Sequence, residues 1–290
     1  STLLASSAAS DVYKRQEINI MSNRKNDWNH KNIWNHGYVT TPQAHLYYEI
    51  SGHGTPILFL HGNSQSHHIF HSYARKLQGS YQVILMDSRG HGFSHLKDSW
   101  ANRLFTIHDM ALDVAALLDK LHISKIILFG FSDGANIALE FSSLYPERTL
   151  AVISASGNAL PHGLRLPVRL AARFTGQIFR TIKKLVPGGP LRQSLTNWQQ
   201  LNSLLTDSPS LSADRLHQIT APVLLIAGAR DLIKTSHTNW MASQIPDCQL
   251  YLVEGGTHQV IFLRESECWK VIWNFLKNIP LLPMRNTNNS

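Results

Sequence analysis

A serine, an aspartate and a histidine, each placed just after a short apolar run, form the pattern with the clearest chemical meaning in this sequence. Ser132 lies in Gly130-Phe131-Ser132-Asp133-Gly134, a G-x-S-x-G pentapeptide between a predicted strand and a predicted helix. A serine hydroxyl is a weak nucleophile near neutral pH, so it needs a base, and the base needs a group that orients it. Asp231 and His258 follow two later apolar runs, in the chain order that accompanies such a turn. We therefore predict Ser132 as nucleophile, His258 as base and Asp231 as the orienting acid.

Each of these residues also has a plainer interpretation. Small residues often mark strand-to-helix turns, Asp231 is a residue type that caps helices, and His258 is an ordinary loop histidine by type alone. The strand–turn–helix context of Ser132 and the Gly255-Gly256 approach to His258 favour the catalytic interpretation.

A second turn supplies the expected oxyanion hole. His61-Gly62-Asn63 ends another apolar run, and Asp133 directly follows the nucleophile. We expect the backbone N–H groups of Asn63 and Asp133 to converge on the oxyanion of a tetrahedral intermediate. The alternative is a simple glycine turn, and its coincidence with the serine turn favours the functional interpretation.

The elements that must position these residues are short runs, apolar on both faces, that alternate with helical patterns. Such runs are typical of parallel strands buried on both sides, and the alternation predicts an α/β fold with a doubly wound, mostly parallel sheet. Parallel sheets place functional sites at the carboxyl ends of their strands. The predicted strands are His45–Ile50, Ile57–Leu60, Val83–Met86, Ile126–Phe129, Ala151–Ile153, Val223–Ile226 and Leu250–Val253, and the predicted helices are Ile107–Leu121, Asp133–Tyr145 and Arg264–Leu276.

The segment 156–218 breaks this rhythm and is predicted to be an inserted helical cap. No acidic residue occurs between Arg148 and Thr206, and arginines recur every four residues beside an apolar series that predicts one amphipathic helix. We expect a lid whose apolar face covers the active site and whose cations are solvated. Two alternatives stay open: contact with an anionic membrane surface, or arginines that turn inward to bind a substrate carboxylate. Candidate substrate-binding residues are Phe131, beside the nucleophile, and Arg169 and Arg173 on the cap.

Residues 38–279 resemble α/β-hydrolases of the capped, cofactor-free group that includes esterases, enol-lactonases, carbon–carbon bond hydrolases and biphenyl-hydrolase-like proteins. The resemblance rests on His61-Gly62-Asn63, the loop Asp87-Ser88-Arg89-Gly90-His91-Gly92-Phe93-Ser94, the Ser132 turn, Gly228-x-x-Asp231 and Gly255-Gly256-Thr257-His258. It implies the α/β-hydrolase fold and a Ser-His-Asp triad. Haloalkane dehalogenases and epoxide hydrolases carry aspartate where this chain has Ser132, so those activities are not expected. We assign the loop 87–92 a structural role, with Arg89 tying loops together.

The resulting expectation is a carboxylesterase-like enzyme that cleaves a small-molecule acyl substrate through an acyl-enzyme. Cleavage of a carbon–carbon bond or a lactone by the same triad is the alternative within enzymes. A non-catalytic ligand-binding member of the fold is the rival from another class, and retention of all three triad residues argues against it.

Composition bounds the remaining possibilities. The chain has 290 residues, 43% of them hydrophobic, and a formal charge of +8, which favours anionic partners in general. No nucleic-acid-binding motif accompanies that charge, and no apolar run reaches the roughly 18–20 residues that span a bilayer. The two cysteines, Cys248 and Cys268, fit a reducing compartment, so we expect a cytoplasmic protein.

We expect neither a metal nor an organic cofactor. Sixteen histidines are present, but the cluster His67, His68 and His71 has no acidic or cysteine residue beside it in the sequence, and three histidines on a helix surface are predicted to be solvated.

The ends of the chain are predicted to lie outside the fold. Ser1–Gln16 lack a basic region and an apolar core, which argues against a signal peptide, and they resemble translated adapter sequence. Met21 is the expected natural start. We expect residues 1–37 to be a leader and a poorly ordered segment, 38–155 and 219–279 to form the core, 156–218 the cap, and 280–290 a tail.

Overall fold

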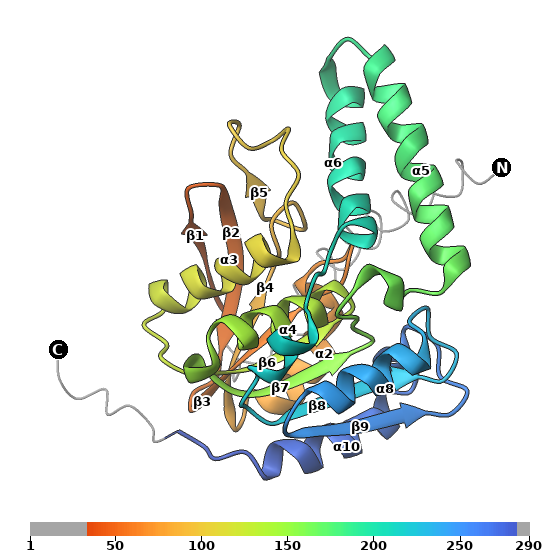
Figure 1. The fold of residues 1–290 in the computed structure, drawn as a ribbon. Helices are drawn as coiled ribbons and strands as arrows, with labels where there is room; N and C mark the ends of the chain where they lie inside the picture. The colour runs from red at the N-terminus through yellow and green to blue at the C-terminus, as the bar shows by residue number, and fades with distance from the viewer. Residues whose placement is uncertain (1–33, 283–290) are drawn as a thin grey trace. The chain divides into compact units, whose positions relative to one another are not determined.

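A computed structural model describes residues 34–282 of the protein. Its central element is one sheet with the strand order β1-β2-β4-β3-β6-β7-β8-β9, and the short β5 pairs with β2 (Figure 1). The neighbours from β4 to β9 along this order pair in parallel, whereas β2 runs antiparallel to β4. The predicted α/β class and mostly parallel sheet are therefore confirmed.

The strands agree with the apolar runs in the sequence to within a few residues. They are β1 Asn35–Thr40, β2 Ala44–Ser51, β3 Thr55–Leu60, β4 Tyr81–Met86, β5 His95–Leu96, β6 Ile126–Phe131, β7 Thr149–Ala155, β8 Val223–Gly228 and β9 Cys248–Val253. Every residue of β3, β6 and β8 is buried. β9 lies at the end of the strand order and is only partly covered, unlike the fully buried strand that its apolar sequence predicts.

Helices cover both faces of the sheet. The helices of residues 34–282 are α2 His71–Leu77, α3 Ile107–Lys120, α4 Asp133–Leu144, α5 Leu166–Leu185, α6 Gly189–Thr206, α7 Ala213–His217, α8 Thr235–Gln244, α9 Val260–Leu263 and α10 Glu265–Lys277, with short 3₁₀ turns at His67–Phe70, Pro146–Arg148 and Pro161–Gly163. The start of α3 is fixed by Thr106, whose hydroxyl accepts the N–H of Asp109 in a reciprocal capping box.

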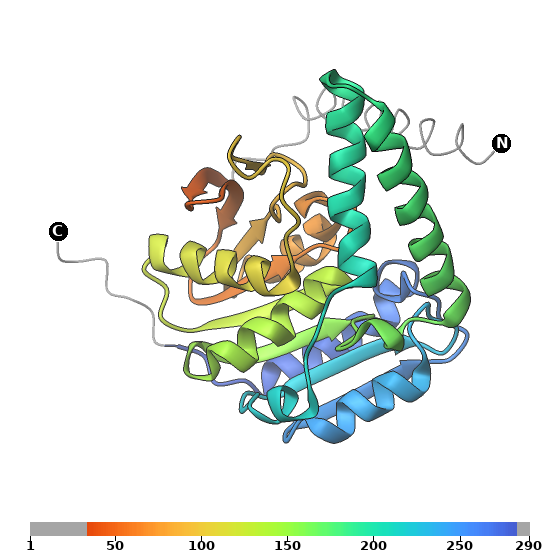
Figure 2. The ribbon, with the colours of Figure 1, turned by 45° about the horizontal axis from the view of Figure 1, so that its top comes forward.

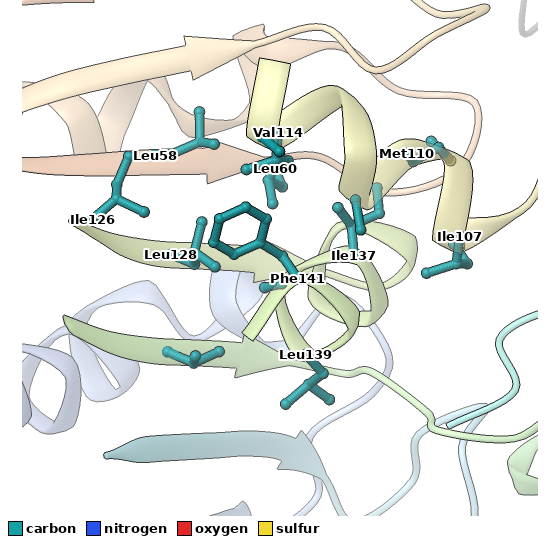
Figure 3. Close-up of a cluster of buried hydrophobic side chains, with 14 of the residues drawn as sticks. Leu58, Leu60, Ile107, Met110, Val114, Ile126, Leu128, Ile137, Leu139 and Phe141 are labelled. Carbon is teal, nitrogen blue, oxygen red and sulfur yellow. The ribbon is translucent and has the colours of Figure 1, made fainter. Parts of the chain in front are cut away.

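Alternation along the strands divides the core into two layers. Leu58 and Leu128 point toward α3 and α4, where Val114 and Phe141 meet them in one apolar cluster (Figure 3). On the opposite face Phe59 and Phe129 pack on Phe70 of the first 3₁₀ turn. Phe129 also meets Tyr73 of α2, whose ring contacts Trp269 of α10. Packing on both faces holds the strands rigidly, so the loops at their carboxyl ends start from fixed positions.

The interval between β7 and β8 holds the insertion that the sequence predicts. α5 and α6 form a helical hairpin that projects away from the sheet (Figures 1 and 2). The pair is held by stacking of Phe179 on Trp198 and by close approach at Gly176, where a Cβ atom would lie 2.5 Å from the Asn202 amide.

The ends of the chain differ in part from expectation. β1 begins at Asn35, so residues 35–37, expected to be poorly ordered, belong to a strand. At the other end the Leu282 N–H donates to Thr55 Oγ1 at 2.7 Å. The expectations for residues 1–33 and 283–290 lie outside the described residues. Between residues 34 and 282, no helix is long and apolar enough to cross a membrane.

Candidate active site

Ser132 occupies a strained turn between β6 and α4. Its φ is 54° and its ψ is −119°, a conformation that L-residues rarely adopt. The flanking glycines are required by space: a Cβ on Gly134 would lie 1.9 Å from the Leu60 carbonyl oxygen, and one on Gly130 would lie 2.1 Å from the Gly134 oxygen. The turn can therefore lift the Ser132 hydroxyl out of the sheet only because Gly130 and Gly134 lack side chains.

The structure brings together the three residues that the sequence singles out. The Ser132 hydroxyl lies 3.0 Å from His258 Nε2, and His258 Nδ1 lies 2.6 Å from Asp231 Oδ1. These residues are 126 and 27 positions apart along the chain, and each follows a strand: β6, β9 and β8 respectively. A serine bonded to a histidine that a carboxylate orients is the arrangement that nucleophilic hydrolysis needs.

Asp231 is held as an anion by its contacts. Its side chain is 1% exposed, and burial alone would raise the pKa of its carboxyl group. Hydrogen bonds from His258 and from the Ile233 N–H, the latter at 3.0 Å, outweigh burial and keep the pKa below the usual value. A fixed negative charge beside Nδ1 favours the tautomer in which Nε2 is free to accept the serine proton.

Asn63 and Asp133, the two predicted oxyanion-hole residues, lie beside Ser132. A Cβ placed on Gly62 would lie 3.0 Å from the Ser132 Cβ, so the loop after β3 passes directly beside Ser132. The Asn63 side-chain amide donates to Asp133 Oδ2 and to the Leu201 carbonyl, both at 2.9 Å. These contacts tie the loop, the serine turn and α6 together.

The Asp133 side chain is a buried carboxyl group next to Ser132. Burial raises its pKa to about 6, although the hydrogen bond from Asn63 and the proximity of His258 act in the opposite direction. This side-chain environment cannot be predicted from the sequence, which points only to the backbone N–H of Asp133.

The candidate substrate-binding residues are placed differently from one another. Phe131 is 2% exposed and its ring packs against His258, with ring centroids 5.2 Å apart. It therefore supports the histidine ring and is not open to a substrate. Arg173 is exposed, whereas Arg169 is half-buried and its Nε atom is covered without a hydrogen-bond partner among the described residues. No contact joins either arginine to Ser132, His258 or Asp231 in the described part of the chain.

Arg165 is the cap cation that reaches the site, and the sequence did not distinguish it from its neighbours. Its Nε atom donates to the Asp231 carbonyl oxygen at 2.6 Å, and its backbone N–H donates to the Leu232 carbonyl. The first turn of the cap is thereby anchored to the loop that carries the acid. Only the fold reveals this contact, because 66 residues separate the two partners.

The apolar face of α5 differs from expectation. The predicted lid places this face over the active site, but its six large side chains are between 40% and 79% exposed. They are Leu166, Leu170, Phe174, Ile178, Ile182 and Leu185. The helix packs on α6 through Ala172, Gly176 and the ring of Phe179 instead, so these six side chains are left exposed.

The loop 87–92 has the structural role that the sequence predicts for Arg89. The guanidinium group of this residue is buried and makes two bonds to the Asp113 carboxylate, at 2.6 and 2.8 Å, and one to Gln43. It therefore ties the loop to α3 and to the segment before β2.

The histidine cluster is less exposed than expected. His67 is 1% exposed, and its Nδ1 and Nε2 atoms lie 2.8 Å from Asp87 and 3.3 Å from Glu49. Burial lowers the pKa of His67, but the two carboxylates overcome this and raise it to about 9. The expectation of a solvated cluster is wrong for His67, because the fold brings to it acidic groups that the local sequence does not contain.

Comparisons with known proteins agree with the fold. The alpha/beta hydrolase fold family matches residues 55–188. The chain is 25% identical over 255 residues to 2-(acetamidomethylene)succinate hydrolase of Mesorhizobium japonicum, covering 78% of this chain and 89% of that protein. It is 26% identical over 262 residues to a pimeloyl-[acyl-carrier protein] methyl ester esterase of Xanthomonas campestris, covering 81% of this chain and all of that protein.

A solved structure described as Est816, an N-acyl homoserine lactone degrading enzyme, superposes with a TM-score of 0.67 at 25% identity, covering 82% of this chain and 100% of that one. Together with the sheet order and the serine turn, these likenesses define the class of protein. The chain has the α/β-hydrolase fold, and its relatives support its being a hydrolase.

Proposed function

We propose that this hydrolase is a serine esterase that uses Ser132, His258 and Asp231 as its catalytic triad. The observation that carries the proposal is the continuous chain of contacts from Ser132 Oγ through His258 to Asp231, at 3.0 and 2.6 Å, on a strained turn. A serine with only a structural role would not need a φ of 54°, close backbone packing at Gly130 and Gly134, and a hydrogen bond between its hydroxyl and a histidine.

The proposed reaction runs through an acyl-enzyme. His258 Nε2 takes the hydroxyl proton as Ser132 Oγ attacks the substrate carbonyl carbon, and Asp231 stabilises the imidazolium that forms. The proton then passes to the alcohol oxygen as the carbon–oxygen bond breaks. Water, deprotonated by His258, attacks the acyl-enzyme, and the acid leaves as Ser132 recovers its proton.

The oxyanion would be held by the backbone N–H groups of Asn63 and Asp133. The Asp133 N–H lies at the first turn of α4, where backbone donors are free and the helix dipole favours negative charge. Neither N–H donates a hydrogen bond to another group in residues 34–282. The Asn63 side chain would set the position of the first donor through its bonds to Asp133 and Leu201.

The same constellation supports a lactonase, because a lactone is an internal ester that the acyl-enzyme route opens without further groups. The likeness to Est816, described as degrading N-acyl homoserine lactones, favours this second candidate. Carbon–carbon bond cleavage by the triad is the remaining alternative, and the contacts at Ser132 do not distinguish it.

The test is hydrolysis of p-nitrophenyl esters from acetate to decanoate, with Ser132→Ala measured in parallel. A homoserine lactone and a vinylogous diketone serve as competing substrates, and product analysis identifies the bond that breaks. Ester turnover that is lost in the variant supports the proposal. Turnover of the diketone alone, or ester turnover that survives in Ser132→Ala, would overturn it.

A further inference from the structure

The outer side of α5 carries an apolar stripe that no described residue covers. We call it the α5 stripe: Leu166, Leu170, Phe174, Ile178, Ile182 and Leu185. Phe174 and Leu185 are 69% and 79% exposed, which is unusual for such large apolar side chains. Ala172 and Gly176, which face α6, are buried. The helix therefore turns its small residues and Phe179 toward α6 and leaves the six large side chains of the stripe exposed.

Cations accompany the stripe without any acidic residue. Seven arginines and lysines and no aspartate or glutamate occur in residues 149–206, a segment that contains both helices of the hairpin. Near the tip, four of these cations line a cavity of about 330 Å³ together with Gln177, Thr181 and Gln199. They are Arg180, Lys183, Lys184 and Arg192.

Several donors in this cavity are already oriented. Arg192 donates to the Lys183 and Val186 carbonyl oxygens, and Lys183 Nζ donates to Gln199 at 3.2 Å. Burial and the nearby Arg192 lower the pKa of Lys183, as expected where like charges gather with no carboxylate to balance them. A phosphate group would supply the missing negative charge and accept hydrogen bonds from both residue types.

An apolar stripe flanked by cations suits one kind of partner better than others. A second copy of this chain would cover the stripe, but it would also bring seven uncompensated cations against seven more. The interface of an anionic bilayer provides acyl chains for the large apolar residues and phosphate groups for the cations at the same time.

We propose that the α5–α6 hairpin is a membrane-docking surface for anionic phospholipid, with the α5 stripe entering the interface and the cavity at the tip holding a headgroup phosphate. The stripe begins at Leu166, next to Arg165, whose guanidinium group contacts the Asp231 loop. Docking would therefore place the rim of the active site beside the lipid surface. The inference concerns binding and does not depend on the chemistry at Ser132.

The experiment is flotation of the full chain with vesicles, using Ser132→Ala protein so that turnover plays no part. Vesicles of phosphatidylcholine alone are compared with equal parts of phosphatidylcholine and phosphatidylglycerol, at about 0.1 and 0.5 M salt, because screening separates the charge contribution from the apolar one. We expect binding to the phosphatidylglycerol vesicles, weakened by salt. Phe174→Glu and the double variant Arg180→Glu/Lys184→Glu should each weaken it by about tenfold or more.

Matched controls test whether the effect belongs to this surface. Leu112→Glu places the same charge on an exposed leucine of α3, and Lys120→Glu/Lys125→Glu makes the same change of net charge far from the hairpin. Circular dichroism checks that each variant is folded. The proposal is overturned if the wild type does not float with anionic vesicles, or if the controls weaken binding as much as the hairpin variants do. It is also overturned if light scattering shows a dimer that Phe174→Glu dissociates while vesicles bind no protein.

Discussion

The Asn63 side chain donates a hydrogen bond to the buried carboxylate of Asp133 at 2.9 Å, and so joins the loop after β3 to the turn that carries the nucleophile. The same amide group also donates to the Leu201 carbonyl of α6. One side chain therefore connects the core, the serine turn and the inserted hairpin. The strength of the hydrogen bond from Asn63 to Asp133 depends on the charge of the Asp133 carboxyl group, whose pKa is raised to about 6.

This raised pKa predicts a pH-dependent contribution of Asp133 to stability. The folded protein holds the carboxyl proton more tightly than the unfolded chain does, since the usual value is 3.8. The stabilisation is complete below the unfolded pKa and is lost as the pH rises through about 6. We expect Asp133→Asn, which keeps an acceptor for Asn63, to gain about 2 kcal/mol of stability relative to wild type between pH 4 and pH 7.5.

Urea denaturation at a series of pH values measures this difference. Asp98→Asn, a substitution of an exposed carboxylate, is the control and should track the wild type at every pH. A constant difference between Asp133→Asn and wild type across the series would mean that the Asp133 carboxyl group is not perturbed by burial.

We expect the negative charge of the Asp231 carboxylate, and not the shape of its side chain, to determine the rate of ester hydrolysis. Asp231→Asn retains the size of the side chain but offers His258 Nδ1 an amide that favours the wrong tautomer. We expect kcat/KM on p-nitrophenyl esters to fall roughly 10³- to 10⁴-fold, with little change in the unfolding temperature. Asp207→Asn, a substitution of an exposed residue at the end of α6, should leave the rate unaltered. A decrease of less than tenfold for Asp231→Asn would remove this residue from the triad.

The sheet, and the meeting of Ser132, Asp231 and His258 at its edge, could be predicted from the sequence because both depend on local patterns. Short apolar runs such as Ile126–Phe129 that alternate with helical segments indicate buried parallel strands. The carboxyl ends of such strands lie along one edge of the sheet. Ser132 and His258 are predicted from this geometry together with the G-x-S-x-G turn and the Gly255-Gly256 approach.

Contacts across the fold were not predictable in the same way. Arg165 is one of seven similar cap cations, and its bond to the Asp231 carbonyl depends on how the insertion folds back onto β8. His67 likewise meets Glu49 and Asp87 only after strands β2 and β4 pair. The α5 stripe is exposed because another face of α5 packs on α6. The apolar period of the sequence shows which residues share a helix face, but it does not show what that face packs against.

Close backbone contact at the serine turn predicts a strong effect of a single methyl group. In Gly134→Ala the new Cβ would sit 1.9 Å from the Leu60 carbonyl oxygen, which two rigid elements hold in place. We expect a loss of about 3 kcal/mol or more in the free energy of unfolding, and a loss of esterase activity in the protein that folds. Gly79→Ala is the matched control, since a Cβ there meets nothing within 4 Å. Equal unfolding temperatures for the two variants would contradict the tight packing at the turn.

The cap arginines predict a preference among substrates that can be measured as a ratio. Arg169 has a covered Nε atom without a partner in the described chain, and Arg173 lies four residues further along the same helix. If they attract a substrate carboxylate, the variant Arg169→Ala/Arg173→Ala should lower kcat/KM for an anionic p-nitrophenyl hemiester about fivefold relative to a neutral ester of equal length. Lys120→Ala/Lys125→Ala removes the same charge far from the cap and should leave this ratio unchanged. If both double variants give the wild-type ratio of kcat/KM for the anionic and neutral esters, Arg169 and Arg173 do not select anionic substrates.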